Sequence, residues 1–185
     1  MSMAKLVILD RDGVINQDSD AFIKSVDEWI PVPGSLEAIV RLKKAGYTVV
    51  VASNQSGIAR GLFDLSTLQA IHDKMQQALA QRGSAIDGIY FCPHGPNDNC
   101  DCRKPKPGLL LQIIAEFKVK PADTIFVGDS YRDIQAARFA GSQPVLVKSG
   151  KGSKTFNDHG PFSDVPVYQD LSHFVREFIK KNHEQ

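Results

Sequence analysis

Two carboxylates spaced one residue apart are the side chains of this sequence best placed to do chemistry. Asp10 and Asp12 follow the apolar run Lys5-Leu-Val-Ile-Leu9 directly and precede Gly13. Such a run predicts a buried parallel strand, and the glycine predicts a tight turn at its end. Side chains at positions i and i+2 of an extended segment point to the same side. Both acids are therefore expected to face one crevice, while Arg11 turns away.

Carboxylates held this close repel each other, and a divalent cation removes the repulsion. The pair then suits phosphoryl transfer, in which one acid attacks or holds the metal and the other moves protons. The same residues are compatible with a solvated turn at the end of a strand. The rest of the chain decides between these two interpretations.

The elements that must position these acids alternate between strands and helices. An irregular loop is expected over 14–33, then a helix from Ser35 to Lys44, a strand over 47–52 and a helix over 66–82 that Ser66 caps. Alternation of this kind predicts an α/β fold, a doubly wound parallel sheet covered on both faces. Further strands are expected over 86–91, 124–127, 144–147 and 165–168, further helices over 109–117, 132–140 and 171–179, and a polar loop over 150–164.

Ligands of open parallel sheets bind beyond the carboxyl ends of the strands. The first strand delivers Asp10 and Asp12 to that edge, and further acids, cations and a hydroxyl follow the other strands. So many polar groups at one edge favour a functional site over a solvated turn. The additional residues expected there are Ser53, Asn54, Arg103, Lys104, Asp129, Ser130 and Asp133.

A second cluster consists of thiols and an imidazole. Cys92, His94, Cys100 and Cys102 have the spacing C-x-H-x5-C-x-C. Four such ligands with no open position predict a structural, tetrahedral Zn²⁺ site, with redox use or a chance cluster as the alternatives. The zinc would order the loop 92–104 and so position the cations that end it. The remaining histidines lack ligand spacing and are expected on the surface or on helix faces.

Four short motifs, in this order along the chain, resemble those of the haloacid dehalogenase superfamily of phosphohydrolases. The resemblance covers residues 5–148 and implies a Rossmann-like fold without a cap domain. Because the intervals between the motifs are short, they have no room for such a domain. The motifs are Asp10-Arg-Asp12-Gly13, Ser53-Asn54, Lys104-Pro105 and Gly128-Asp129-Ser130-Tyr-Arg-Asp133.

The resemblance also implies a role for each motif. Asp10 would be the nucleophile that forms an aspartyl-phosphate, and Asp12 would protonate the leaving alkoxide and then activate water. Ser53 and Lys104 would bind the phosphoryl oxygens. Asp133 would either stabilise the first turn of a helix or orient Lys104 or the metal. Catalytic Mg²⁺ would be held by Asp10, the backbone carbonyl of Asp12, Asp129 and Ser130.

Two subfamilies are similar in their zinc loop, the heptose 1,7-bisphosphate 7-phosphatases of ADP- or GDP-heptose synthesis and the histidinol-phosphate phosphatases. Segments 53–61 and 147–152 resemble the heptose enzymes. A bisphosphate needs a second anion-binding site, which Arg60, Arg103, Lys148 and Lys151 could supply. The short zinc spacer resembles that of the histidinol enzymes instead, and the sequence of 18–21 departs from the usual residues of the heptose enzymes. The residues that the heptose resemblance would place against a small phosphorylated sugar are Asp18, Ser19, Asn54, Gln55, Ser56, Arg60, Arg103 and Lys148.

Length and composition limit the remaining possibilities. The 185 residues predict a single domain over 1–185, and 22 basic against 21 acidic residues leave a net charge of +1. This balance predicts no nucleic-acid or membrane partner, and we expect a monomer. Three clustered cysteines fit a reduced, cytoplasmic protein better than a disulfide framework. A receiver-like signalling domain also gathers acids and a lysine, but it would lack the zinc loop and Asp12.

Overall fold

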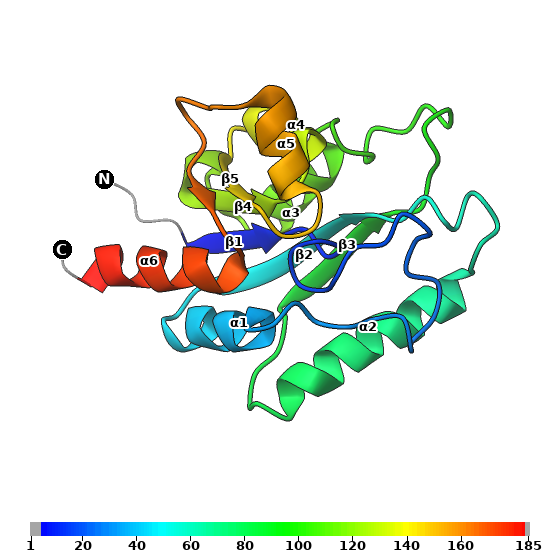
Figure 1. The fold of residues 1–185 in the computed structure, drawn as a ribbon, viewed down its shortest axis with the longest axis horizontal. Helices are drawn as coiled ribbons and strands as arrows, with labels where there is room; N and C mark the ends of the chain where they lie inside the picture. The colour runs from blue at the N-terminus through cyan, green and yellow to red at the C-terminus, as the bar shows by residue number, and fades with distance from the viewer. Residues whose placement is uncertain (1–4, 184–185) are drawn as a thin grey trace.

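The computed structural model describes residues 5–183, and a six-stranded sheet forms its centre (Figure 1). The spatial order is β3-β2-β1-β4-β5-β6, and every neighbouring pair is parallel. This confirms the predicted doubly wound α/β fold. The strands are β1 (Leu6–Leu9), β2 (Thr48–Asn54), β3 (Gly88–Cys92), β4 (Thr124–Gly128), β5 (Gln143–Val147) and β6 (Val167–Tyr168).

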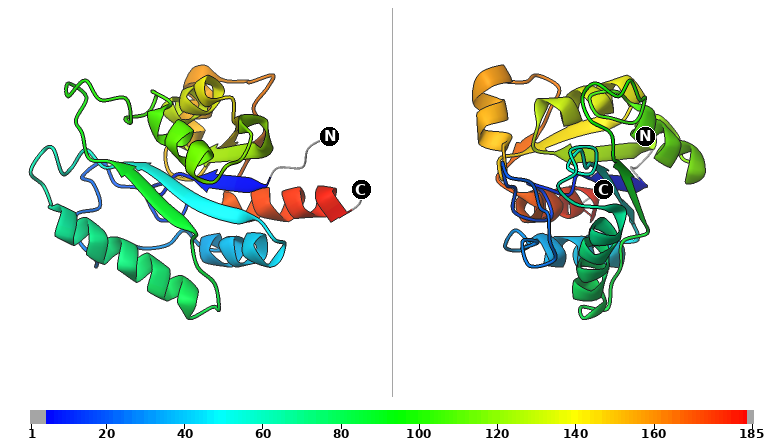
Figure 2. Two further views of the ribbon diagram at one scale, coloured as in Figure 1. Left: turned by 180° about the vertical axis from the view of Figure 1, so that it is seen from behind. Right: turned by 90° about the vertical axis from the view of Figure 1, so that its right-hand side faces the viewer.

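Helices cover both faces of this sheet, as the views from behind and from the side also show (Figure 2). One face carries α1 (Ser35–Lys44), α2 (Leu65–Ala80) and α6 (Leu171–His183). The other carries α3 (Gly108–Glu116) and α4 (Tyr131–Ala140). A 3-10 turn, Pro121–Asp123, leads into β4.

Strand β1 is apolar at every position because it is buried from both sides. Val7 and Leu9 pack into the core beneath α1, α2 and α6, whereas Leu6 and Ile8 pack into the core beneath α3 and α4. All four side chains are fully buried. Strand order reverses at β1, between β2 and β4, so the crevice expected at such a switch point lies directly beyond Leu9.

Two local expectations are wrong. Part of the predicted loop 150–164 is the helix α5 (Gly152–His159), which is mostly polar but is held by Phe156 packing against a small core at the β5 edge. The cap of α2 is Asp64, whose Oδ1 accepts a hydrogen bond of 2.8 Å from the Thr67 amide, and not Ser66. In both cases the polar sequence was compatible with more than one local structure.

The connections agree with the predicted lack of a cap domain within residues 5–183. Between β1 and β2 the chain forms the irregular loop 14–33 and α1, and between β2 and β3 it forms α2. None of the helices in the described part of the chain is both long and apolar enough to cross a membrane.

Candidate active site

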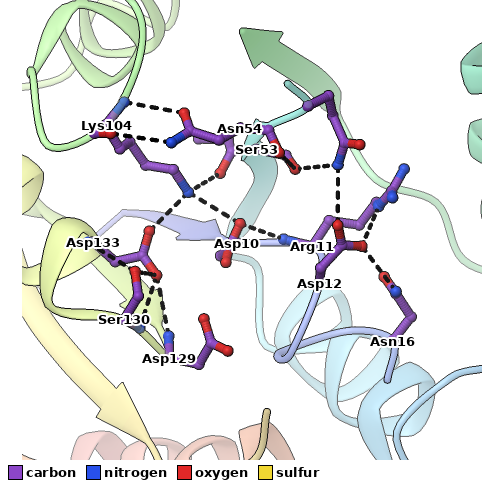
Figure 3. A network of polar contacts seen from close by, with 12 residues as sticks. Asp10, Arg11, Asp12, Asn16, Ser53, Asn54, Lys104, Asp129, Ser130 and Asp133 are labelled. Atoms are coloured by element: carbon purple, nitrogen blue, oxygen red, sulfur yellow. Dashed lines mark hydrogen bonds and ion pairs between the residues drawn. The ribbon is translucent and has the colours of Figure 1, made fainter. Parts of the chain in front are cut away.

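A buried lysine links two carboxylates at the switch point. Lys104 Nζ lies 3.0 Å from Asp10 Oδ1 and 2.8 Å from Asp133 Oδ1, and it donates a 2.9 Å hydrogen bond to the Ala52 carbonyl (Figure 3). Burial alone would discharge this amine, but Asp10 and Asp133 outweigh burial and raise the pKa of Lys104. The side chain is therefore a fixed ammonium at the carboxyl end of β1 and β2.

The carboxylate of Asp10 has one engaged and one free oxygen. Oδ1 accepts hydrogen bonds from the Arg11 amide at 2.9 Å and from Lys104. Among the described residues, no donor lies within hydrogen-bond distance of Oδ2. Burial and then the Asp133 charge raise the pKa of Asp10 to about 7, against the opposing effect of Lys104. The site is therefore short of positive charge around this group.

The carboxylate of Asp12 is held by three side chains. Arg11 Nε and Asn16 Nδ2 donate to Oδ1 at 2.8 and 2.9 Å, and Gln55 Nε2 donates to Oδ2 at 3.3 Å (Figure 3). Burial opposes ionisation, but Arg11 and these hydrogen bonds outweigh it and lower the pKa of Asp12. Two carboxyl groups in one cavity thus have pKa values shifted in opposite directions: Asp12 is held as the carboxylate, whereas burial pushes Asp10 toward its neutral form. A cation beside Asp10 would favour its charged form, which a nucleophile needs.

Asp133 serves two purposes that the sequence offered as alternatives. Its Oδ2 accepts hydrogen bonds from the Asp129 and Ser130 amides, and the Ser130 side chain accepts from the Asp133 amide in return, which makes a capping box at the start of α4. Its Oδ1 pairs with Lys104. The helix cap therefore fixes the carboxylate that orients the lysine.

Asn54 also acts on Lys104. Its side-chain amide donates to the Lys104 carbonyl at 3.1 Å and accepts from the Lys104 amide at 3.0 Å. These paired bonds attach the end of the zinc loop to the end of β2. The resemblance suggested substrate contact for Asn54, and this positioning contact was not foreseen, because only the fold brings residues 54 and 104 together.

A cavity of about 140 Å³ opens over Asp10. The loop 14–33 covers one side of it, as expected, and the zinc loop and the start of α4 form the other. Asp10 and Asp12 both line it, as their spacing predicted. The remaining lining residues are Asp18, Ser19, Asp20, Phe22, Asn54, Ser56, Arg103, Lys104, Asp129, Ser130, Arg132, Asp133 and Lys151.

Four residues predicted for the site do not line this cavity. Ser53 and Gln55 are buried beside it and bond each other, Gln55 Nε2 donating to Ser53 Oγ at 2.7 Å. The Arg60 guanidinium lies 5.6 Å from the centre of the Phe22 ring, and Lys148 Nζ lies 4.8 Å from that of Phe156. In the structure Gln55 contacts Asp12 in place of a substrate.

The sequence interpretation did not include Phe22 or Arg132 among the site residues, although both line the cavity. The position of Arg132, inside the motif that runs from Gly128 to Asp133 and in the first turn of a predicted helix, was a usable signal. Phe22 has a left-handed backbone, with φ at 66°, within a loop whose path the sequence does not define.

The acids of the cavity fit a divalent cation. Carboxylate oxygens of Asp10, Asp129 and Asp133 lie within 4.8 Å of one another. Burial and then the Asp10 charge raise the pKa of Asp129 well above its ordinary value, so Lys104, which pairs with Asp10 and Asp133, does not neutralise all three acids. A Cβ at Gly13 or Gly150 would collide with the Asp129 carboxylate, which explains the two glycines there. The Ser130 hydroxyl, predicted as a ligand, is engaged with Asp133.

The thiols and imidazole of the zinc loop converge as their spacing predicted. Cys92 Sγ lies 3.6 Å from Cys100 Sγ and 2.9 Å from Cys102 Sγ, and His94 Nδ1 lies 3.3 Å from Cys102 Sγ. One ligand atom from each of the four residues lies within 4.8 Å of the other three, which fits a tetrahedral Zn²⁺. The described cysteines form no disulfide.

Removal of zinc is expected to lower the catalytic activity of this site by about tenfold or more, because Lys104 lies two residues after Cys102 and needs an ordered loop. Hydrogen exchange should show lost protection over 92–104 with the sheet still protected. Re-addition of Zn²⁺ is the control and should restore both. A zinc-free protein with full kcat would contradict this positioning role.

Comparison with known proteins now places the chain in a class. The family model for haloacid dehalogenase-like hydrolases matches residues 4–141, and this chain belongs to that family. The chain is 55% identical, over 96% of its length and 99% of the relative, to D-glycero-beta-D-manno-heptose-1,7-bisphosphate 7-phosphatase from Bordetella bronchiseptica. It is 56% identical to the enzyme of that name from Neisseria meningitidis, with 96% of each chain covered.

Solved structures show the same relationship. A crystal structure of D,D-heptose 1,7-bisphosphate phosphatase from B. bronchiseptica, complexed with magnesium and phosphate, matches with a TM-score of 0.93 at 55% identity, covering 96% of this chain and 99% of that one. The corresponding enzyme from Burkholderia thailandensis matches with a TM-score of 0.75 at 47% identity, covering 95% and 98%.

Proposed function

We propose that this chain is a magnesium-dependent phosphatase that removes the 7-phosphate from D-glycero-D-manno-heptose 1,7-bisphosphate. The observation that carries the proposal is the meeting of Asp10, Asp12, Lys104 and Asp129 at one cavity. The names of relatives at 55% and 56% identity support the same substrate. The chain would work as one domain without a cap, with its specificity in the loops around the cavity.

The proposed reaction uses the two acids that line the cavity, Asp10 and Asp12. Asp10 attacks phosphorus through Oδ2, the oxygen free of described donors, and forms an aspartyl-phosphate while the bond to the sugar oxygen breaks. Asp12 must enter this step protonated, unlike in the free chain, where its pKa is lowered, and it gives that proton to the oxygen. It then takes a proton from a water molecule that attacks phosphorus, so that phosphate leaves and Asp10 is regenerated. Lys104 holds positive charge against the phosphoryl oxygens throughout, because Asp133 and Asn54 fix its position.

Asp10, Asp129 and the backbone of Asp12 would hold Mg²⁺, with Ser130 as the further ligand that the resemblance suggests. When bound, the cation would neutralise the carboxylates and the incoming phosphate. The magnesium and phosphate in the B. bronchiseptica structure support this assignment. The thiol and imidazole cluster would hold Zn²⁺ with a structural role only.

The cavity wall carries cationic side chains that could bind the second phosphate of a bisphosphate substrate. Arg103 and Arg132 line the cavity, and no acid forms an ion pair with either one in the described chain. Burial and then the Arg132 charge lower the pKa of Arg103, and Arg60 acts in the same direction, while Cys92 and Cys100 oppose them. Three guanidinium groups therefore lie near one another. Guanidinium pairs bind phosphate well, and we assign the 1-phosphate to Arg103 and Arg132.

The acids of the loop do not create a matching cation site for histidinol phosphate. Lys151 Nζ lies 3.6 Å from Asp18 Oδ2 and 3.5 Å from Asp20 Oδ1, so these two charges already have a partner. Asp18 and Ser19 remain available to hydrogen-bond sugar hydroxyls. The charge left over at the cavity rim is positive, which favours a bisphosphate over a substrate that carries an ammonium.

Phosphate release from heptose 1,7-bisphosphate and from histidinol phosphate, measured side by side, tests the substrate. We expect Arg132→Ala to raise KM for the bisphosphate about tenfold or more and to leave a sugar monophosphate nearly unchanged, because a charged hydrogen bond is lost. Arg138→Ala is the control, since Arg138 lies on the same helix and pairs with Asp164 away from the cavity. Equal losses with both substrates would refute the assignment of the second phosphate.

Two further expectations belong to this proposal. We expect the chain to act as a monomer, because Asp10, Asp12, Lys104 and Asp129 already meet within one fold. Free thiols arranged as zinc ligands fit a reducing compartment such as the cytoplasm.

A further inference from the structure

The side chain between the two catalytic acids is buried and has few partners. Arg11 is fully buried, and its guanidinium contacts Asp12 through Nε at 2.8 Å. Its Nη2 atom has no hydrogen-bond partner in the described chain. The one other polar contact of the guanidinium is Nη1 to Nε2 of His72, at 3.3 Å. The orientation of Arg11 therefore depends on Asp12 at one end and on His72 at the other.

His72 lies on α2 and reaches this point from the core face of that helix. The sequence predicted a surface or helix-face histidine, but only 3% of its surface is exposed, and it shares its helix face with Leu68, Ile71 and Met75. Burial and then the Arg11 charge lower the pKa of His72 to about 4, so the ring is neutral. A neutral ring with its proton on Nδ1 presents Nε2 as an acceptor to the guanidinium.

An apolar residue would fill such a core position without the cost of burying a polar ring. The ring does pack against Phe91, with centroids 5.9 Å apart, but packing requires no nitrogen at that place. What the nitrogen adds is the contact with Arg11. Because Arg11 is one of three donors that fix Asp12, the effect of this contact extends to the proton carrier of the proposed reaction.

We propose that His72 is a positioning residue for Asp12, acting through Arg11. The inference rests on the proposed phosphatase function and adds to it a residue outside the cavity. Without the acceptor, the guanidinium is free to turn about its remaining contact, and the carboxyl group of Asp12 loses its alignment with the leaving oxygen. Proton donation to that oxygen is the step that suffers.

This role predicts a dependence on the leaving group. A sugar alkoxide must be protonated as its bond to phosphorus breaks, whereas p-nitrophenolate leaves without a proton. The ratio kcat/KM covers the steps up to release of the alcohol and not the later hydrolysis of the aspartyl-phosphate. It therefore measures the need to protonate the leaving group separately from the activation of water. We expect His72→Phe, which keeps the ring but removes the acceptor, to lower kcat/KM for heptose 1,7-bisphosphate about tenfold to hundredfold. The same variant should change kcat/KM for p-nitrophenyl phosphate by less than about threefold.

Three variants sharpen the test. His72→Gln returns an acceptor at the same reach and should restore most of the activity toward the sugar phosphate. In an Asp12→Asn background, His72→Phe should cause no further loss, because the group that it positions is gone. Met75→Leu, a change on the same buried helix face, is the packing control and should affect both substrates equally and little. Should His72→Phe fold poorly, His72→Met removes the acceptor with a flexible side chain.

The outcomes are distinct. A folded His72→Phe protein that loses activity equally on both substrates, or on neither, overturns the positioning role, as does a glutamine variant no better than phenylalanine. A wild-type chain that releases phosphate from neither substrate removes the proposed function itself. Loss confined to the sugar phosphate, with rescue by glutamine, supports the inference.

Discussion

Asp10→Asn is expected to abolish turnover, lowering kcat by about 10⁴-fold or more. The amide is not a nucleophile, so no aspartyl-phosphate can form, and loss of a nucleophile typically removes most of the catalysis that it shares with its partners. The measurement is Mg²⁺-dependent phosphate release from the bisphosphate. Unimpaired turnover in this variant would reject covalent catalysis by Asp10.

To show that Asp10→Asn loses chemistry and not folding, the free energy of unfolding of the metal-free variant is compared with that of the metal-free wild type. The pKa of Asp10 is about 7 in the fold, above its ordinary value of 3.8. Between these values the folded state binds the proton that the unfolded state has lost, so this group stabilises the fold at low pH and that contribution disappears as pH rises through 7. Asparagine carries no such charge. The metal-free variant should therefore be more stable than wild type by a growing margin from pH 4 to pH 7, measured by urea unfolding, which separates lost chemistry from lost folding.

Lys104→Met should produce the second large effect. Activity is expected to fall about 10²-fold or more, because a preorganised cation at the phosphoryl group is lost. The variant also leaves Asp10 and Asp133 facing each other without a counter-ion, and breaking a buried ion pair from one side costs about 3–5 kcal/mol. Thermal unfolding and phosphate release measure the two consequences.

Lys44→Met, on the exposed surface of α1, is the control and should change neither quantity. Because the destabilisation arises from the carboxylates, Mg²⁺ should recover part of the stability of Lys104→Met without recovering its activity. A variant with wild-type kcat would show that Lys104 does not contact the phosphoryl group. A variant with wild-type stability would show that the two carboxylates do not need it.

The sequence by itself determined most of the fold and the position of the site along the chain. Apolar runs of strand length alternating with amphipathic helices leave few alternatives to a parallel sheet, and ligands of such sheets bind at strand ends. Asp10 and Asp12 were placed correctly in one cavity because side-chain alternation in a strand is a local property. The zinc loop was equally local, since its ligands span residues 92–102 only.

Tertiary structure decided how these groups act on one another. That Asp133 pairs with Lys104, that Asn54 clamps the same lysine, and that His72 contacts Arg11 all depend on distances across the sheet that no short segment encodes. The helix α5 and the placement of Arg132 at the cavity have the same origin. A pKa depends on burial and on neighbouring charges, so the opposite pKa shifts of Asp10 and Asp12 exist only in the folded chain.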